Sequence, residues 1–285
     1  MAQRVPYNLF MNPQLPSYTP SRFLEGHVIA LTGADRGFGR VLAQGLADAG
    51  ATLVLVGKQG EQLSTLASVI ESRGSTAISM QADVSVPLDW VKVQARILEI
   101  FGALRGVVHS ADKRMHASQL LPNQPEALLS EAEWLELFQA NIKSSVAVVQ
   151  SLQQRLPESW LTIIGPHLDE EDMPAQTQRG ALGGLVSSAR SEHFRVNLLL
   201  PSRAPSGEDD LDTGMVSSVL ALAAPTLMHL SGLTVDVLLP ELEKHELEQL
   251  TLEQRANFLL PRARAAQPKT GQPRGTQGSA HGELP

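Results

Sequence analysis

The sequence has no cysteine and no long hydrophobic run, and each absence excludes a class of protein. Without cysteine the chain forms neither disulfides nor thiolate metal sites, a usage that fits a cytoplasmic protein. No apolar stretch reaches the roughly 20 residues that a membrane-spanning helix needs, so we predict no membrane association. The eight histidines include no pair at metal-ligand spacing, so we predict no metal site.

Charge and length narrow the class further. The net charge is −7 with acids and bases interspersed, which argues against a nucleic-acid partner. The 285 residues, 42% of them hydrophobic, are enough to bury a full core. Proline punctuates the beginning of the chain, and proline, glycine and glutamine dominate its end. We therefore predict an N-terminal arm at 1–24, one folded domain at 25–240, a helical extension at 241–260 and a disordered tail at 261–285.

One stretch near the start of the folded domain organises the rest. An apolar, β-branched run at His27–Thr32 meets three glycines at the spacing G-x-x-x-G-x-G, and a helical pattern follows at once. The N-terminus of a helix that follows a strand and a tight turn offers backbone N–H groups and a positive dipole end to a phosphate. The pattern predicts a dinucleotide site, although a tight turn without a ligand is the alternative. The candidate contacts are Thr32, Gly33, Asp35, Arg36, Gly37, Phe38 and Gly39.

Strand-like and helix-like segments alternate after this stretch. Near-continuous apolar strands that alternate with amphipathic helices indicate a parallel sheet covered on both faces. We therefore predict an α/β fold with a doubly wound parallel sheet, a Rossmann fold of about seven strands. The further strands are predicted at Thr52–Val56, Thr76–Met80, Gly106–Ser110, Trp160–Ile164, Arg195–Leu200 and Leu233–Leu238.

Landmarks spread over residues 26–238 resemble the short-chain dehydrogenase/reductase family. The glycine motif comes first, followed by the helix motif around Asn141, the Arg195–Pro201 strand and the Ser231–Asp236 segment. The resemblance implies a Rossmann domain that binds a nicotinamide dinucleotide. It also implies further cofactor contacts after the third and fourth strands, at Asp83, Val84, Ser110 and Ala111.

The same resemblance implies a proton relay of serine, tyrosine, lysine and a helix asparagine. Alignment places Pro166, Ala175 and Arg179 at the expected serine, tyrosine and lysine positions, so that Asn141 alone is retained. Alanine has no proton to transfer, and both tyrosines of the chain lie in the N-terminal arm. Arg179 retains donors for a ribose, or it is a surface residue. Asn141 has an alternative role, bonding to backbone across a helix distortion.

Two polar groups beside the expected cleft could replace the relay or be ordinary solvated loops. One is His167 with the acids at 169–172, and the other follows the fourth strand. The members of the second group are His109, Lys113, Arg114 and His116.

The end of the second strand bears on the choice of dinucleotide. An acid there would accept a hydrogen bond from the ribose 2′-OH and repel a 2′-phosphate. This chain has Gly57 and Lys58 instead, together with Arg36 in the glycine loop. We therefore expect NADP(H) rather than NAD(H), with loss of cofactor binding as the alternative.

The resulting expectation is an NADP(H)-binding protein that is catalytically impaired and acts as a regulatory, sensing or partner subunit. The first alternative is an active NAD(P)H-dependent oxidoreductase of a carbonyl or alcohol with a non-standard proton donor. The second is a scaffold without cofactor. Three glycines at 180, 183 and 184 allow close helix approach, and in the family this helix commonly lies in an interface. We expect self-association, or pairing with a related subunit, through the helices near 130–156 and 177–192.

Overall fold

A computed structural model describes the chain over most of its folded part. The described residues are 22–113, 129–156, 158–167, 173–191, 193–202, 210–224, 229–237 and 262–264. The expected helical extension at 241–260, nearly all of the predicted arm, and the candidates Arg114, His116 and 169–172 lie outside them.

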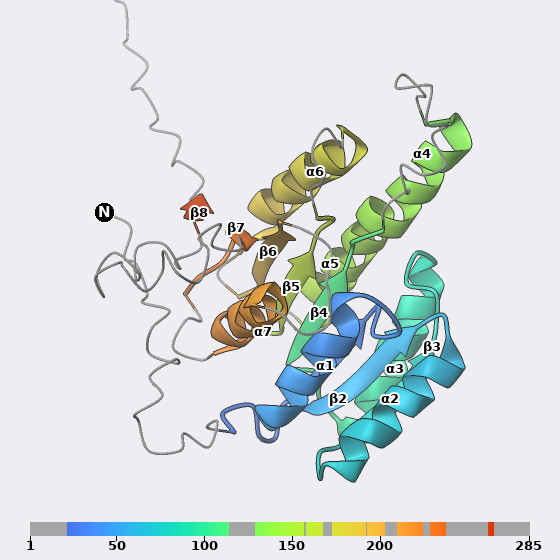
Figure 1. Ribbon diagram of the computed structural model, residues 1–285, viewed down its shortest axis with the longest axis vertical. Coiled ribbons are helices and arrows are strands. Elements are labelled where there is room, and N and C mark those ends of the chain that lie inside the picture. Colours follow the sequence, from blue (N-terminus) through green and yellow to red (C-terminus); the bar gives the residue numbers. More distant parts are fainter. Residues whose placement is uncertain are drawn as a thin grey trace, which may run out of the picture.

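Seven parallel strands form the central sheet, in the spatial order β3-β2-β1-β4-β5-β6-β7. The predicted doubly wound Rossmann fold is therefore confirmed, and the predicted strands match to within one residue at nearly every end (Figure 1). The order of the strands reverses between β1 and β4, which is where such sheets bind ligands at their carboxyl edge. The strands are β1 (Val28–Thr32), β2 (Thr52–Gly57), β3 (Ala77–Gln81), β4 (Gly106–Ser110), β5 (Trp160–Ile164), β6 (Arg195–Pro201) and β7 (Thr234–Val237).

Helices cover both faces of this sheet (Figure 1). They are α1 (Phe38–Asp48), α2 (Gly60–Ser72), α3 (Pro87–Phe101), α4 (Glu131–Leu137), the π-helix η3 (Phe138–Lys143), α5 (Ser144–Arg155), α6 (Met173–Ala189) and α7 (Asp210–Ala223). Side chains alternate between the faces with the period of a strand, so the central strands β1, β2, β4, β5 and β6 bury side chains on both sides. In β1, Ile29 and Leu31 pack with α1, α2 and α7, whereas Val28 and Ala30 pack with α3, α5 and α6.

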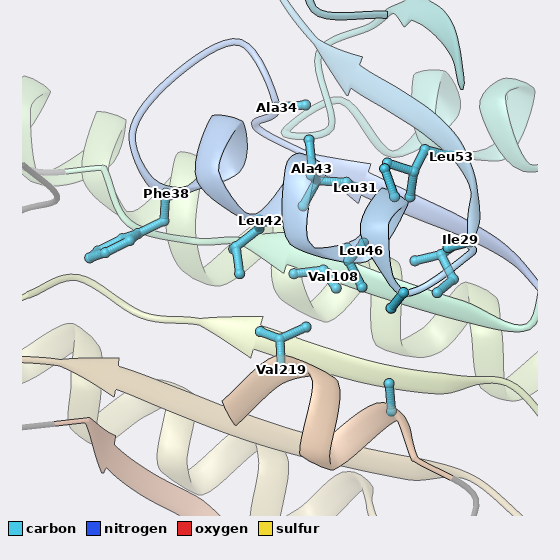
Figure 2. Packing of buried hydrophobic residues seen from close by; sticks show 14 of the residues in the cluster. Ile29, Leu31, Ala34, Phe38, Leu42, Ala43, Leu46, Leu53, Val108 and Val219 are labelled. Atoms are coloured by element: carbon cyan, nitrogen blue, oxygen red, sulfur yellow. The ribbon is translucent and has the colours of Figure 1, made fainter. Parts of the chain in front are cut away.

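The first of these two cores holds α1, and with it the glycine loop, against the sheet. Figure 2 shows Leu42 and Leu46 of α1 gathered with Val108 of β4 and Val219 of α7. All four side chains are fully buried. Because the core fixes α1 along much of its length, the position of its N-terminus above the strand ends is fixed as well.

An eighth strand extends the sheet beyond the prediction. β8 (Arg262–Arg264) pairs antiparallel with β7, although it lies in the segment for which composition predicts disorder. An edge strand presents free backbone N–H and C=O groups that pair with any extended segment, whatever its hydrophobicity. Composition therefore did not reveal this pairing.

Candidate functional site

The loop between β1 and α1 requires each of its three glycines. Gly33 and Gly37 have positive φ angles of 69° and 52°, a region that residues with a side chain rarely adopt. Gly39 is tightly packed: a Cβ there would lie 2.2 Å from the carbonyl oxygen of Gly33 and 2.8 Å from the Cα of Ala34. The motif therefore produces a compact turn that leads straight into the first turn of α1.

This turn leaves hydrogen-bonding capacity at the carboxyl edge of the sheet. The N-cap of α1 is Gly37, which has no side chain to bond the first N–H groups, and the first helical turn carries no acid. Ser110, at the end of β4, is only 6% exposed, and its Oγ has no hydrogen-bond partner among the described residues. A Cβ on Gly33 would lie 3.2 Å from that Oγ. The Gly39 N–H donates to the Arg36 carbonyl at 3.0 Å, so the Ser110 hydroxyl and the uncapped start of α1 are what this turn offers to an anionic ligand with hydroxyl groups.

A buried histidine lies behind the loop and is structural. His109 of β4 is completely buried, and its Nδ1 and Nε2 lie 2.8 Å from Thr32 Oγ1 and 3.1 Å from Ser144 Oγ. Ser144 Oγ donates to the Ala140 carbonyl, and Thr32 Oγ1 accepts the Ser110 N–H, which favours the tautomer with hydrogen on Nε2. Burial lowers the pKa of His109 to about 3. The imidazole therefore stays neutral and links β1, β4 and α5, and it is not exposed at the carboxyl edge of the sheet.

Asp35 reaches from the glycine loop to the end of β2. Its Oδ2 accepts hydrogen bonds from the backbone N–H groups of Lys58, at 2.9 Å, and Gln59, at 3.0 Å. A Cβ on Gly57 would lie 2.6 Å from Oδ1 of Asp35. The carboxylate thus occupies the space that a side chain at Gly57 would fill, and an acid does stand at the end of β2.

Two of the predicted cofactor contacts pair with each other. Lys58 Nζ lies 2.6 Å from Asp83 Oδ2, and Asp83 Oδ1 accepts hydrogen bonds from the N–H and Oγ of Ser85. Burial raises the pKa of Asp83, but the hydrogen bonds from Lys58 and Ser85 outweigh it, so that the pKa lies below its ordinary value. Val84 and Ala111 pack on the core that α3 and α5 form with the sheet, just below its carboxyl edge.

Arg179, at the expected lysine position, ties three strand ends together. Its Nη1 donates to the carbonyls of Pro166 and Pro201, both at 3.0 Å, and its Nη2 donates to Asp236 Oδ1 at 2.9 Å. Its side chain is 11% exposed. Burial lowers the pKa of Arg179, and Asp236 opposes that shift. The guanidinium is therefore engaged by the protein itself.

Asn141 is likewise engaged. It lies in η3, where its Oδ1 accepts the Lys113 N–H at 2.9 Å and its Nδ2 donates to the Lys113 carbonyl at 2.7 Å. The same Nδ2 donates to Oε1 of Gln178, whose Nε2 donates to the Pro174 carbonyl at 3.1 Å. The structure supports the backbone-bonding role, because the asparagine holds the chain after β4 across a distorted helix.

Gln178 is the residue that the sequence-based prediction missed. It is 4% exposed and lies on α6 three residues after Ala175, so both face the interior. The detectable signal was a polar residue on the inward face of a helix of small residues. Ala175 is itself buried and has no hydroxyl that could serve a relay.

The remaining candidates add no second centre to the described residues. His167 is half-buried after β5, and the acids expected beside it fall outside the described part of the chain. Within that part there is no group of three or more residues that could hold a metal ion. Among the described helices, none combines the length and apolar content that crossing a bilayer requires.

Comparisons with known proteins agree with this geometry. Residues 27–162 match the family described as short chain dehydrogenase. An uncharacterized oxidoreductase of Listeria monocytogenes is 31% identical over 120 residues, which are 42% of this chain and 46% of that relative. The match thus spans less than half of the relative's length.

Two solved structures share the fold. A citronellol catabolism dehydrogenase of Pseudomonas aeruginosa superposes with a TM-score of 0.65 at 20% identity, covering 78% of this chain and 96% of that one. A short-chain dehydrogenase/reductase of Serratia marcescens superposes with a TM-score of 0.63 at 18% identity, covering 75% and 98%. Residues 27–162 therefore resemble the short chain dehydrogenase family, and the described chain has the fold of these two solved structures.

Proposed function

We propose that this chain binds a nicotinamide dinucleotide at the carboxyl edge of β1 and β4 and is catalytically impaired, acting as a regulatory, sensing or partner subunit. One contrast carries the proposal. The glycine loop is complete and has an unpaired Ser110 hydroxyl beside it, whereas Ala175 and Arg179 stand where the family resemblance expects the relay tyrosine and lysine. The groups that would bind a dinucleotide are present, whereas the groups expected to transfer a proton are absent.

The residues divide the work as follows. The loop glycines and the N-terminus of α1 would hold the diphosphate, and Ser110 would donate or accept at an adjacent hydroxyl. Asp83 and Val84 would border the adenine. A bound nicotinamide supplies hydride transfer, which requires orientation but no protein proton. The missing step is proton transfer at the substrate oxygen, which typically contributes about 10²–10⁴-fold to rate.

A titration with a matched pair of glycine variants tests the binding half. We expect NADH or NADPH to give saturable binding below millimolar concentration in calorimetry. Gly39→Ala should weaken binding at least tenfold, because the new Cβ would collide with the Gly33 carbonyl. Gly180→Ala is the control, since a Cβ there meets nothing within 4 Å. Absence of saturation in the unaltered protein would overturn the proposal and leave a cofactor-free scaffold.

An active oxidoreductase is the second candidate, and the intact glycine loop together with the oxidoreductase name of the Listeria relative favours it. Its proton would come from water or from another side chain. Aldehydes, ketones and enoyl compounds can be screened for oxidation of NADH and NADPH. Turnover that is lost in Gly39→Ala but kept in Gly180→Ala would establish activity at this site. Turnover at background with intact binding supports impairment.

Oligomer formation and cellular location belong to the same proposal. Leu135 and Phe138, on the helices near 130–156, are 53% and 52% exposed, which supports contact with a second subunit there. Gly180 and Gly184 on α6 are exposed and face open space. Light scattering on the purified protein measures the subunit number directly. A cytoplasmic location stays a prediction.

The two dinucleotides have opposing support. The exposed Arg36 favours NADP(H), as the sequence predicts, while the Asp35 carboxylate at the end of β2 favours NAD(H). The position of Asp35 removes one premise of the sequence-based expectation, which was that no acid stands there.

A further inference from the structure

The side chain of Asp35 belongs to one strand end and acts at another. It begins in the loop after β1, yet its carboxyl group lies over Gly57 at the end of β2. The residue is only 6% exposed. No side chain other than the hydrogen of glycine would fit at position 57 without displacing it, since a Cβ there would lie within 2.7 Å of three carboxyl atoms.

Backbone donors hold the carboxylate in this orientation. The N–H groups of Lys58 and Gln59 both donate to Oδ2, at 2.9 and 3.0 Å. Oδ1 receives no hydrogen bond from the part of the chain that the structure describes, so that oxygen retains its accepting capacity. Asp35 is therefore a fixed acid with one free acceptor at the end of the second strand.

One of the two neighbouring cations is already paired with another acid. Lys58 is paired with Asp83 at 2.6 Å, so the cation expected to meet a 2′-phosphate already has an anionic partner. Arg36 is exposed and remains as the nearby positive charge in the loop. Two acids thus face two cations at this edge, and the excess of positive charge inferred from the sequence is absent.

An acid at this place distinguishes the two dinucleotides by charge. It accepts a hydrogen bond from a ribose 2′-OH and repels a 2′-phosphate. We propose that Asp35 sets the cofactor preference of this site, so that the chain favours NAD(H), with its free 2′-OH, over NADP(H). This inference rests on the proposed dinucleotide binding and reverses the preference expected from the sequence, because tertiary structure supplies the acid from β1 instead of β2.

Fragments without nicotinamide isolate this effect from the altered proton relay. ADP-ribose and 2′-phospho-ADP-ribose differ only in the 2′ group, and calorimetry gives the dissociation constant of each. We expect the unaltered protein to bind ADP-ribose at least tenfold more tightly. Asp35→Asn removes the charge and keeps the shape, and it should reduce that ratio at least tenfold, mainly by tighter binding of the phosphorylated fragment.

Asp48→Asn is the matched control, because it changes net charge equally at the exposed far end of α1, about 15 Å along the helix. It should leave the ratio unchanged. Circular dichroism establishes that the variants fold, and if Asp35→Asn does not fold, Asp35→Ser and the ratio in the unaltered protein decide.

The outcomes separate the two proposals. If neither fragment binds the unaltered protein, the proposed dinucleotide site fails, and the role of Asp35 fails with it. If both bind equally, or the phosphorylated fragment binds more tightly, dinucleotide binding stands and the role of Asp35 is overturned. An equal change of ratio in Asp48→Asn and Asp35→Asn would also overturn it, since net charge alone would then explain the effect.

Discussion

Two parts of the carboxyl edge of the sheet differ in how their polar groups are satisfied. Near β1 and β4, the Ser110 hydroxyl has no partner among the described residues, and the N-cap Gly37 has no side chain to bond the first N–H groups of α1. At β5–β7, Arg179 bonds to the strand ends, while Asn141 bonds to the backbone after β4 and to Gln178 of α6. Trp90 and Thr162 also carry buried polar atoms without a partner, so the Ser110 hydroxyl indicates a ligand only together with its place beside the glycine loop. The paired donors of Arg179 indicate a structural role.

The largest expected effect on stability comes from removing Arg179, which bonds to the ends of β5, β6 and β7. Arg179→Ala would leave Asp236 and two strand-end carbonyls without their donor, so we expect a loss of about 2–4 kcal/mol in unfolding free energy. Urea denaturation measures it. Arg96→Ala, which breaks an exposed pair with Glu99, should lose under about 1 kcal/mol. A stable Arg179→Ala that binds dinucleotide poorly would instead assign Arg179 to the ligand.

The pH dependence of stability tests the structural role of the buried His109. The folded-state pKa of His109 is about 3, below its ordinary 6.5, so the unfolded chain binds more protons between these values. Stability should therefore fall as pH decreases below about 6.5, by up to about 1.4 kcal/mol per pH unit. His109→Asn should flatten this slope between pH 7 and 5, whereas substitution of the exposed His193 by asparagine should not. Equal slopes in both variants would contradict the assigned role.

The smallest effect is expected at Asn141, where stability and binding should separate. Asn141→Ala removes three hydrogen bonds around Lys113 and Gln178, and we expect a loss of about 1–3 kcal/mol. Binding of ADP-ribose should change less than twofold, because the asparagine bonds to Lys113 and Gln178 rather than to the proposed ligand. Thermal melting and calorimetry on the same sample provide both values. A tenfold loss of binding without loss of stability would contradict this role and assign Asn141 to the ligand site.

Much of the fold follows from local patterns. The apolar strands and the glycine turn are predicted to within one residue at their ends, because period and glycine placement are properties of neighbouring residues. The helix expected near 177–192 instead runs over Met173–Ala189. The assignment of Asn141 and Ala175 to relay positions comes from the family resemblance and stays a prediction. Gln178 was missed, since its partner is 37 residues away and no local pattern marks it.

The sequence alone determined the doubly wound sheet, the glycine loop and the absence of tyrosine and lysine from the expected relay positions. Only the tertiary structure decided what the remaining polar groups do. The Asp35 carboxylate lies at the end of β2 and accepts the Lys58 N–H. Lys58 forms an ion pair with Asp83, and Arg179 forms one with Asp236. The physical reason is range: periodicity acts between neighbours, whereas hydrogen bonds and ion pairs join residues that the fold brings together from distant parts of the chain.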